Sequence, residues 1–343
     1  MASDLRATQV WAEALGLPEA LERTITDARG FDEAAALLGG PAVRRIVATG
    51  NGASYYVAHA LWLASLASGP AGLPEVVALP AGLLARGFSW REGDRLLVVS
   101  SSGRLRDAIE ALEAGAPRPY AAITAAEDSP IGAGAGACAV VHVERQEATT
   151  HTQAYCGNLV GALAVWARLA RDETLAQAVR SVPDAAATGL AEADTWVGRV
   201  APEAGTPIAA IAFGDGPAWA AALETALLVK EIARIPAEGV ETREGATSAM
   251  YGLAPGHLAL SLPTGDDSLV AEAEETCRAA GATVVRVPGG SGADPRLSPV
   301  TTFPAALALA VVLGLRAELD VDHPGWADAY FATARVASPA RDN

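Results

Sequence analysis

The sequence predicts an α/β protein made of two tandem, doubly wound parallel-sheet domains with helices on both faces. Three observations lead to this fold class. Short apolar runs alternate with amphipathic stretches, which is typical of parallel sheets covered by helices. Strand and turn patterns recur at a constant spacing along the chain. The chain has 343 residues, of which 51% are hydrophobic and 19% charged, so it can bury two ordinary cores.

The order of the expected elements follows from these patterns. Residues 1–40 are predicted to form helices, one of them capped by Asp4 or Thr8 and the next beginning at Pro18. The first domain is predicted over 41–185 and the second over 186–343. In the first domain we expect strands at 44–50, 76–80, 95–101, 120–124 and 139–143 and helices at 53–67 and 106–115; helices at 151–171, 174–181 and 184–199 lead to a new strand at 206–214.

An internal repeat supports two copies of one domain. The segment IVATGNGASYY (46–56) matches IAAIAFGDGPAW (208–219), and LLVVSSSG (96–103) matches LALSLPTG (258–265). A third pair, 120–124 and 282–287, has about the same offset. The copies differ at their turns: the first copy has Ser54 and Ser100–Ser102 there, and the second copy has Pro217 and Pro263 in the equivalent turns. We therefore expect one anion site per chain, in the first copy.

Charge and cysteine content restrict the function classes. The net charge of −15 argues against a nucleic-acid or membrane partner, although local donors can still hold a small anion. The three cysteines show no CxxC spacing and the histidines no HxxxH spacing, so no metal site and no cofactor are expected. An odd cysteine count without a secretory leader favours a cytoplasmic protein.

Two polar turns are the candidate anion site. Each follows a strand and precedes a helix, where free N–H groups and the positive end of the helix favour a phosphate. The alternative is that serine and glycine are simply good turn and N-cap residues. The candidate binding residues in these turns are Asn51, Gly52, Ser54, Ser100, Ser101 and Ser102.

These turns resemble those of the sugar isomerase (SIS) domain, a flavodoxin-like fold. The first copy reads strand–G-x-G-x-S-Y–helix and then strand–S-x-S-G–helix. ALETALLVKEIARIPAEG (222–239) is similar to A-L-E-x-A-L-K-x-K-E-x-x-x-I-x-A-E of the isomerase part of glucosamine-6-phosphate synthase and of related sugar-phosphate deaminases and deglycases. VERQEATTHTQAYCGNL (143–159) and LDVDHPGWADAYF (319–331) are similar to a helix start and a closing C-terminal segment of that family, so the likeness covers about 44–331.

The resemblance implies roles for individual residues. It assigns phosphate binding to Ser54, Ser100 and Ser102, with Ser101 in place of a glutamine, and adds Thr152 as a binding residue. Ala53 replaces a hydroxyl of the family pattern, and Arg104 or Arg106 would then supply charge. The ring-opening and proton-shuttling glutamate matches Glu231, and Glu238 matches a second glutamate. The resemblance also implies a homodimer.

Two departures from the family pattern affect the chemistry. Thr247 stands at the position of the histidine that assists ring opening, and Ala329 at the position of a lysine. If a histidine takes over the lost acid–base role, His323 or His151 is the candidate. Lys230 is the only lysine, so any Schiff-base chemistry would need it. The glutaminase part of the synthase is absent from the sequence.

Glu231 is a candidate base on independent grounds. It lies seven residues after Glu224, so both carboxylates share one face of a helix predicted over 217–235 and ended by Pro236. The negative end of the helix dipole raises the pKa of a carboxyl near a helix C-terminus. The alternative is an ordinary solvated helix face.

The combined prediction is an isomerase or deaminase that acts on a sugar phosphate or related aminosugar by proton transfer next to a carbonyl. One alternative is a catalytically degenerate sugar-phosphate sensor or regulator. Another is a specialist for an unphosphorylated sugar-like substrate, with Arg104 facing a carboxylate. The expected partner is a small molecule, with no nucleic acid and no membrane.

Overall fold

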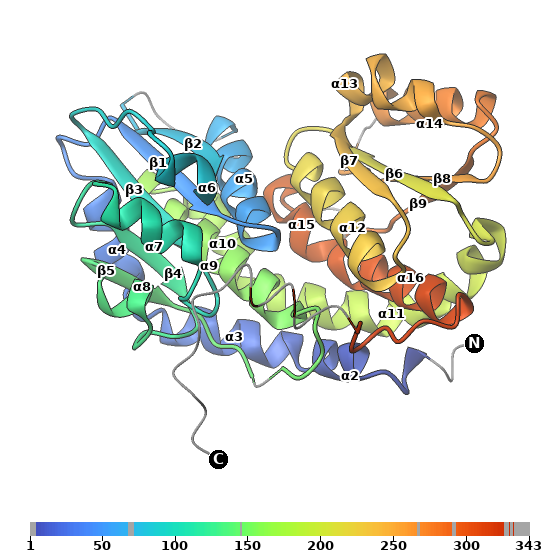
Figure 1. Ribbon diagram of the computed structural model, residues 1–343, viewed down its shortest axis with the longest axis horizontal. Coiled ribbons are helices and arrows are strands. Elements are labelled where there is room, and N and C mark those ends of the chain that lie inside the picture. The colour runs from blue at the N-terminus through green and yellow to red at the C-terminus, as the bar shows by residue number, and fades with distance from the viewer. Residues whose placement is uncertain are drawn as a thin grey trace. The chain divides into compact units, whose positions relative to one another are not determined.

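The computed structural model describes residues 5–67, 72–144, 146–265, 268–289, 293–325, 329 and 332. Within these residues the chain forms one five-stranded and one four-stranded sheet (Figure 1). The strand orders are β2-β1-β3-β4-β5 and β7-β6-β8-β9, and every paired strand is parallel. The predicted α/β class with two parallel sheets is confirmed.

The first sheet is buried on both of its faces. Val47, Leu96 and Val98 pack in one apolar cluster, while Ile46 and Leu97, which point to the opposite face, are equally inaccessible. The strands are β1 (Arg45–Gly50), β2 (Glu75–Pro80), β3 (Asp94–Val99), β4 (Ala121–Thr124) and β5 (Ala137–Val140), and the helices α4 (Phe31–Leu38), α5 (Ala53–Leu66), α6 (Ala81–Ala85), α7 (Arg106–Glu113) and α8 (Pro130–Ala133).

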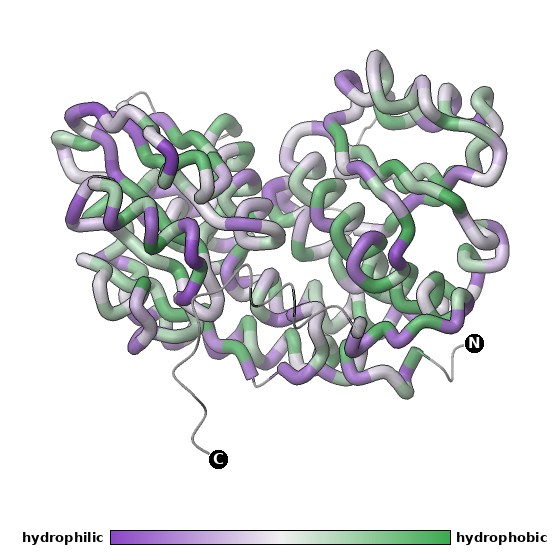
Figure 2. Tube along the Cα trace, in the orientation of Figure 1, coloured by the Kyte–Doolittle hydropathy of each residue, from purple (hydrophilic) through white to green (hydrophobic). Residues whose placement is uncertain are grey.

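The second sheet repeats this plan with one strand fewer among the described residues. Its strands β6 and β8 appear as hydrophobic segments in Figure 2. Helix α12 packs on β6 and β7, and helix α14 on β8 and β9. The bounds are β6 (Ala209–Gly214), α12 (Ala218–Ile232), β7 (Ala237–Glu241), α13 (Thr242–Thr247), η1 (Ala249–Gly252), β8 (His257–Ser261), α14 (Ser268–Ala279), β9 (Thr283–Arg286), η2 (Pro295–Leu297), α15 (Ser298–Thr301) and α16 (Phe303–Arg316).

The repeat extends to backbone geometry. Gly52 and Gly216, each two residues past the end of the first strand of its sheet, have φ of 53° and 51°. A Cβ atom on Gly50 would lie 2.6 Å from the Ser54 carbonyl carbon, and one on Gly214 would lie 2.6 Å from the carbonyl oxygen of Ala218. Both turns therefore need glycine at both positions, which confirms the two-copy prediction.

Two compact units are each assembled from separate stretches of chain. The first-copy unit consists of Thr24–Val143, Gly157–Asp172 and His323–Asn343 and contains the five-stranded sheet. The second-copy unit consists of Met1–Arg23, Glu144–Cys156 and Glu173–Asp322 and contains the four-stranded sheet.

The N-terminal helix α2 (Gln9–Leu15) is capped by a residue more than 300 positions away. The Asp322 carboxylate accepts hydrogen bonds from the backbone N–H groups of Gln9 (3.0 Å) and Val10 (2.8 Å). The prediction that the Thr8 side chain caps this helix is wrong, because its hydroxyl donates backwards to the Leu5 carbonyl at 2.8 Å. Asp4, the other predicted cap, lies outside the described residues.

Four further helices connect or cover the sheets: α3 (Leu17–Asp27), α9 (Thr152–Ala170), α10 (Glu173–Arg180) and α11 (Val182–Ala204). The stretch Pro295–Arg316 is apolar and long enough to cross a membrane by length and composition, but it is wholly buried and belongs to the core. Strand β5 ends at Val140, so the prediction that placed His142 inside a strand is wrong. Its Nε2 atom lies 2.7 Å from an Asp27 carboxylate oxygen.

Candidate functional site

The two predicted anion-binding turns lie side by side in the first-copy unit. Strand β1 pairs with β3 in the register Thr49↔Val98, so the turns that follow them leave the same edge of the sheet. Asn51 forms hydrogen bonds with both ends of its amide: its Nδ2 donates to the Asp107 carboxylate at 2.7 Å, and its Oδ1 accepts from the Ala81 N–H at 3.2 Å. Asn51 thus ties the first turn to α7, the helix that follows the serine turn, and to the start of α6.

Four serine hydroxyls at these turns have no hydrogen-bond partner within the described part of the chain. Ser100 is buried and the other three are half-buried. Hydroxyls clustered at the carboxyl ends of parallel strands, without protein partners, can bind an anion together with nearby N–H groups. These residues are Ser54, Ser100, Ser101 and Ser102.

The serine turn after β3 is held in place by the chain that follows β4. The Ser101 carbonyl accepts from the Thr124 hydroxyl at 3.0 Å and from the Ala125 N–H at 3.1 Å. Gly103 has φ of 60°, and a Cβ there would overlap the Ser129 side chain. By contrast, no atom of the described residues lies within 4 Å of the Cβ position of Gly52, so this backbone is open to a ligand on their side.

The arginines after this turn differ in their contacts. Arg104 is half-buried, and Arg106 donates from Nη2 to the Ala332 carbonyl at 2.9 Å. Arg106 therefore already has a partner, the carbonyl of Ala332.

Glu231 lies in the last turn of α12 of the second-copy unit. Helix α12 ends at Ile232, three residues earlier than predicted, and Arg234 with φ of 54° turns the chain away. Burial raises the pKa of Glu231 to about 7, partly offset by a hydrogen bond from Thr150 and by the charge of Lys230. The bond from the Thr150 hydroxyl to Glu231 Oε2 is long, at 3.3 Å. Such a carboxyl exchanges protons near neutral pH.

Glu224 extends this acidic site into the core. Its side chain is 4% exposed, and its Oε2 atom has no hydrogen-bond partner among the described residues. Burial raises its pKa far above the usual range, and the negative charge of Glu231 raises it further. Both causes favour the protonated form of Glu224. The sequence placed both glutamates on one helix face but gave no sign that Glu224 is buried.

A residue that the sequence analysis did not single out supports the loop before α9. Glu13 in α2 is 7% exposed, and its Oε1 accepts from the N–H groups of Glu147 (2.6 Å) and Ala148 (3.1 Å). The Gln153 side chain donates to the Glu13 carbonyl at 2.8 Å. These bonds hold the segment that contains Thr150, the residue whose hydroxyl donates to Glu231.

The other residues singled out from the sequence differ in their exposure and in their hydrogen bonds. Thr152 is fully buried, and its hydroxyl accepts from the Gln146 amide at 3.0 Å. Glu238 is exposed on the edge strand β7, and the Thr247 hydroxyl donates to backbone carbonyls of its own helix. His323 and Lys230 are exposed and His151 is half-buried.

His59 has structural surroundings. Burial lowers the pKa of His59 to about 4, so this histidine is neutral at physiological pH. Among the described residues no cluster of three or more histidine, cysteine or acidic side chains is arranged to hold a metal ion.

Solved structures share this architecture over nearly the whole chain. The C-terminal domain of glucosamine-fructose-6-phosphate aminotransferase from Francisella tularensis superimposes with a TM-score of 0.78 at 17% identity, covering 93% of this chain and 99% of that one. The tagatose-6-phosphate ketose/aldose isomerase from Escherichia coli gives 0.74 at 16% identity, covering 95% and 99%. Glucosamine-6-phosphate deaminase from Thermotoga maritima gives 0.69 at 18% identity, covering 90% and 96%.

The chain has the double SIS fold. The similarity is carried by structure, because neither a family model nor a curated protein matches the sequence. The first SIS domain carries the serine turns, and the second SIS domain carries the Glu224–Glu231 helix.

Proposed function

We propose that this double SIS protein acts on a sugar phosphate or a related aminosugar by moving a proton between carbons next to a carbonyl. The observation that carries the proposal is Glu231, a carboxyl whose pKa burial raises to about 7. A base works best when its pKa lies near the working pH, because it is then ionised and still accepts a proton readily.

The proposed reaction comprises two tasks, anchoring of the phosphate and transfer of the proton. The serine hydroxyls and N–H groups of the two turns are suited to the first task. The Glu231 carboxylate removes a proton from the carbon next to the carbonyl, which leaves an enediolate, or the corresponding enamine for an aminosugar. Returning that proton to the former carbonyl carbon, while a hydroxyl proton moves from one oxygen to the other, completes an isomerisation without any other reactant.

The similar structures support the substrate class. Their names refer to tagatose 6-phosphate isomerisation and glucosamine 6-phosphate deamination, and both reactions involve proton transfer beside a carbonyl or imine carbon. We further propose that the protein works in the cytoplasm as a homodimer and without a cofactor, with Glu238 and His323 assisting proton transfer and Thr152 and Arg104 assisting binding.

A second candidate function is binding alone, as in a sensor. The Thr247 hydroxyl, at the position where the family has a histidine, is hydrogen-bonded to its own helix, and Ala329 offers no acid–base group. In this alternative the serine turns bind the sugar phosphate, and no reaction follows.

Solvent deuterium exchange into hexose 6-phosphates and glucosamine 6-phosphate tests the reaction. We expect exchange with the wild type and a loss of about 100-fold or more with Glu231→Gln, since a positioned base contributes at least that factor. Glu192→Gln, which changes an exposed glutamate of α11, is the matched control and should exchange like the wild type. Equal exchange by the wild type and Glu231→Gln would remove Glu231 from this role.

Thermal shift with the same compounds separates the two candidates. A ligand at a hundred times its Kd stabilises the protein by about 2.7 kcal/mol. Stabilisation that is lost in Ser100→Ala/Ser102→Ala, without any deuterium exchange, would favour the sensor. No stabilisation by any phosphorylated sugar would contradict the proposed substrate class.

A further inference from the structure

Glu13 is a buried glutamate that the proposed reaction does not use. It lies in α2 and is 7% exposed, and a carboxyl group in such surroundings needs hydrogen bonds to replace the lost water. Its Oε1 atom accepts two of them from backbone N–H groups 134 and 135 residues later in the chain, those of Glu147 and Ala148. Glu13 therefore binds a distant loop, 146–150, which leads into α9.

The next N–H group of this loop is also bound. Thr149 donates to the backbone carbonyl of Asp322 at 2.8 Å. The Asp322 carboxylate in turn accepts from the first N–H groups of α2, the helix that contains Glu13. Three consecutive N–H groups are thus fixed directly before Thr150.

Glu13 also holds the chain that follows Thr150. The Gln146 amide nitrogen lies 3.3 Å from Glu13 Oε2 and donates at 3.0 Å to the hydroxyl of Thr152, the first residue of α9. The Gln153 amide donates to the Glu13 backbone carbonyl at 2.8 Å. Thr150 therefore lies between two segments that are both hydrogen-bonded to Glu13.

Thr150 connects this loop to the candidate base. It is 8% exposed, and its hydroxyl donates to Glu231 Oε2 at 3.3 Å. The β-branched side chain of threonine has few rotamers, so the place of the hydroxyl follows the backbone. A hydrogen bond that is already long is lost when its atoms move slightly further apart. The backbone position set by Glu13 therefore decides whether Thr150 reaches Glu231.

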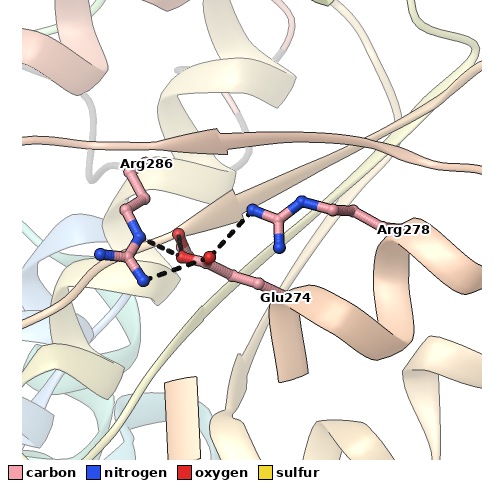
Figure 3. A network of polar contacts seen from close by, with 4 residues as sticks. Glu274, Arg278 and Arg286 are labelled. Carbon is pink, nitrogen blue, oxygen red and sulfur yellow. Dashed lines mark hydrogen bonds and ion pairs between the residues drawn. The ribbon is translucent and has the colours of Figure 1, made fainter. Parts of the chain in front are cut away.

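Another buried glutamate of the same unit has a different arrangement. Glu274 is 3% exposed, and its carboxylate binds the guanidinium groups of Arg278 and Arg286 (Figure 3). These partners belong to its own helix, α14, and to β9, the strand that follows. Glu274 thus stabilises one helix–strand pair, whereas Glu13 binds the backbone of a loop that contacts Glu231.

We propose that Glu13 is a positioning residue for Glu231, because it fixes the loop that holds the Thr150 hydroxyl against the Glu231 carboxylate. With one carboxylate oxygen held by Thr150, the group keeps a defined orientation toward a substrate. This catalytic consequence rests on the proposed function of Glu231 as the base. The positioning itself does not, since it is a property of the substrate-free protein.

The groups that act on Glu231 give the sign of the expected effect. Burial raises its pKa, and the Thr150 hydrogen bond and the charge of Lys230 lower it. Glu224, on the same helix, interacts with it electrostatically. Removing the Thr150 bond leaves burial, Lys230 and Glu224 in place, so the pKa of Glu231 should rise further.

Carboxyl-carbon NMR of the full chain, without substrate, measures this effect. The Glu231 signal is assigned by its absence from Glu231→Gln and is followed as the pH is changed. We expect its titration midpoint to rise by about 0.5–1 pH units in Glu13→Ala and in Thr150→Val, the change equivalent to one net hydrogen bond. Thr150→Ser keeps a hydroxyl and should restore the wild-type midpoint. Glu19→Ala, which changes an exposed glutamate of α3, is the matched control and should leave the midpoint unchanged.

A double variant tests whether Glu13 acts through Thr150. Glu13→Ala/Thr150→Val should have the same midpoint as Thr150→Val alone, because the bond has already been removed. Glu13→Gln keeps an oxygen for the two N–H groups and should give a smaller rise, so it takes the place of Glu13→Ala if that variant does not fold. Shifts that add in the double variant, or an unmoved midpoint in the folded Glu13 variants, would overturn the proposal.

The pH profile of deuterium exchange separates this inference from the proposed function. We expect the profile of Glu13→Ala to move to higher pH by the same amount as the NMR midpoint. A shifted midpoint in a protein whose wild type catalyses no exchange would contradict the proposed reaction and leave the positioning role in place. Exchange by the wild type together with an unmoved midpoint in Glu13→Ala would contradict the positioning role alone.

Discussion

Glu231 shows how a carboxyl becomes a candidate base within a helix. The sequence suggested the helix dipole as the cause of a raised pKa, and the structure identifies burial as the larger cause. Glu224, seven residues earlier on the same helix face, adds a second carboxyl whose pKa is raised, by burial and by the negative charge of Glu231. Both effects disfavour two negative charges close together at this helix.

The raised pKa of Glu231 makes folding stability depend on pH. Between about 4.5 and about 7 the unfolded chain releases this proton while the folded chain keeps it, so stability falls as pH rises through that window. The loss is at most about 3 kcal/mol. We expect Glu231→Gln to melt at a higher temperature than the wild type at pH 8 and to differ little at pH 5, as measured by calorimetry. The same gain at both pH values would contradict this origin.

At the scale of single elements, the strand–glycine turns show the strongest agreement between sequence and structure. The G-x-G pattern after β1 and β6 predicted equivalent turns, and both second glycines have positive φ. Element ends agreed less well, as β5 and α12 show, because residues beyond these ends keep apolar character after the backbone pairing stops. Backbone hydrogen bonding sets where a strand or helix ends, and the hydrophobic pattern of the sequence does not record it.

Gly214→Ala tests the close packing of the second-copy turn. Its Cβ would lie 2.6 Å from the Ala218 carbonyl oxygen, so we expect a loss of about 1–3 kcal/mol of stability in denaturant titrations. Gly198→Ala is the control, because none of the residues that the structure describes comes within 4 Å of its Cβ position inside α11. That change should stabilise by up to about 1 kcal/mol. Similar effects of both changes would show that close approach does not constrain Gly214.

At the scale of the whole molecule, each compact unit is closed by residues far apart in sequence. The second-copy unit combines the first 23 residues with Glu144–Cys156 and Glu173–Asp322. Two buried or half-buried carboxylates make these connections, Glu13 to the loop before α9 and Asp322 to the start of α2. Helix α2 thus belongs to the second-copy unit.

Asp322→Ala tests this closure. The change removes the acceptor for two N–H groups at the start of α2, and we expect a loss of about 0.5–2 kcal/mol. Asp322→Asn keeps an acceptor oxygen and should lose less. Amide hydrogen exchange should show faster exchange at Gln9 and Val10 in Asp322→Ala, and unchanged exchange there would contradict the capping role.

Local chemistry in the sequence was enough to predict the parallel α/β class and the duplication, and to single out the serine turns and Glu231 as candidates. Strand alternation, glycine turns and helix-face spacing are short-range properties. Three features could not be predicted in this way. They are the burial of Glu224, the hydrogen bonds of Glu13 and Asp322 to distant backbone, and the contact of Thr150 with Glu231. Each depends on which side chains from remote segments exclude water or supply a hydrogen bond, and those partners meet only after the chain has folded.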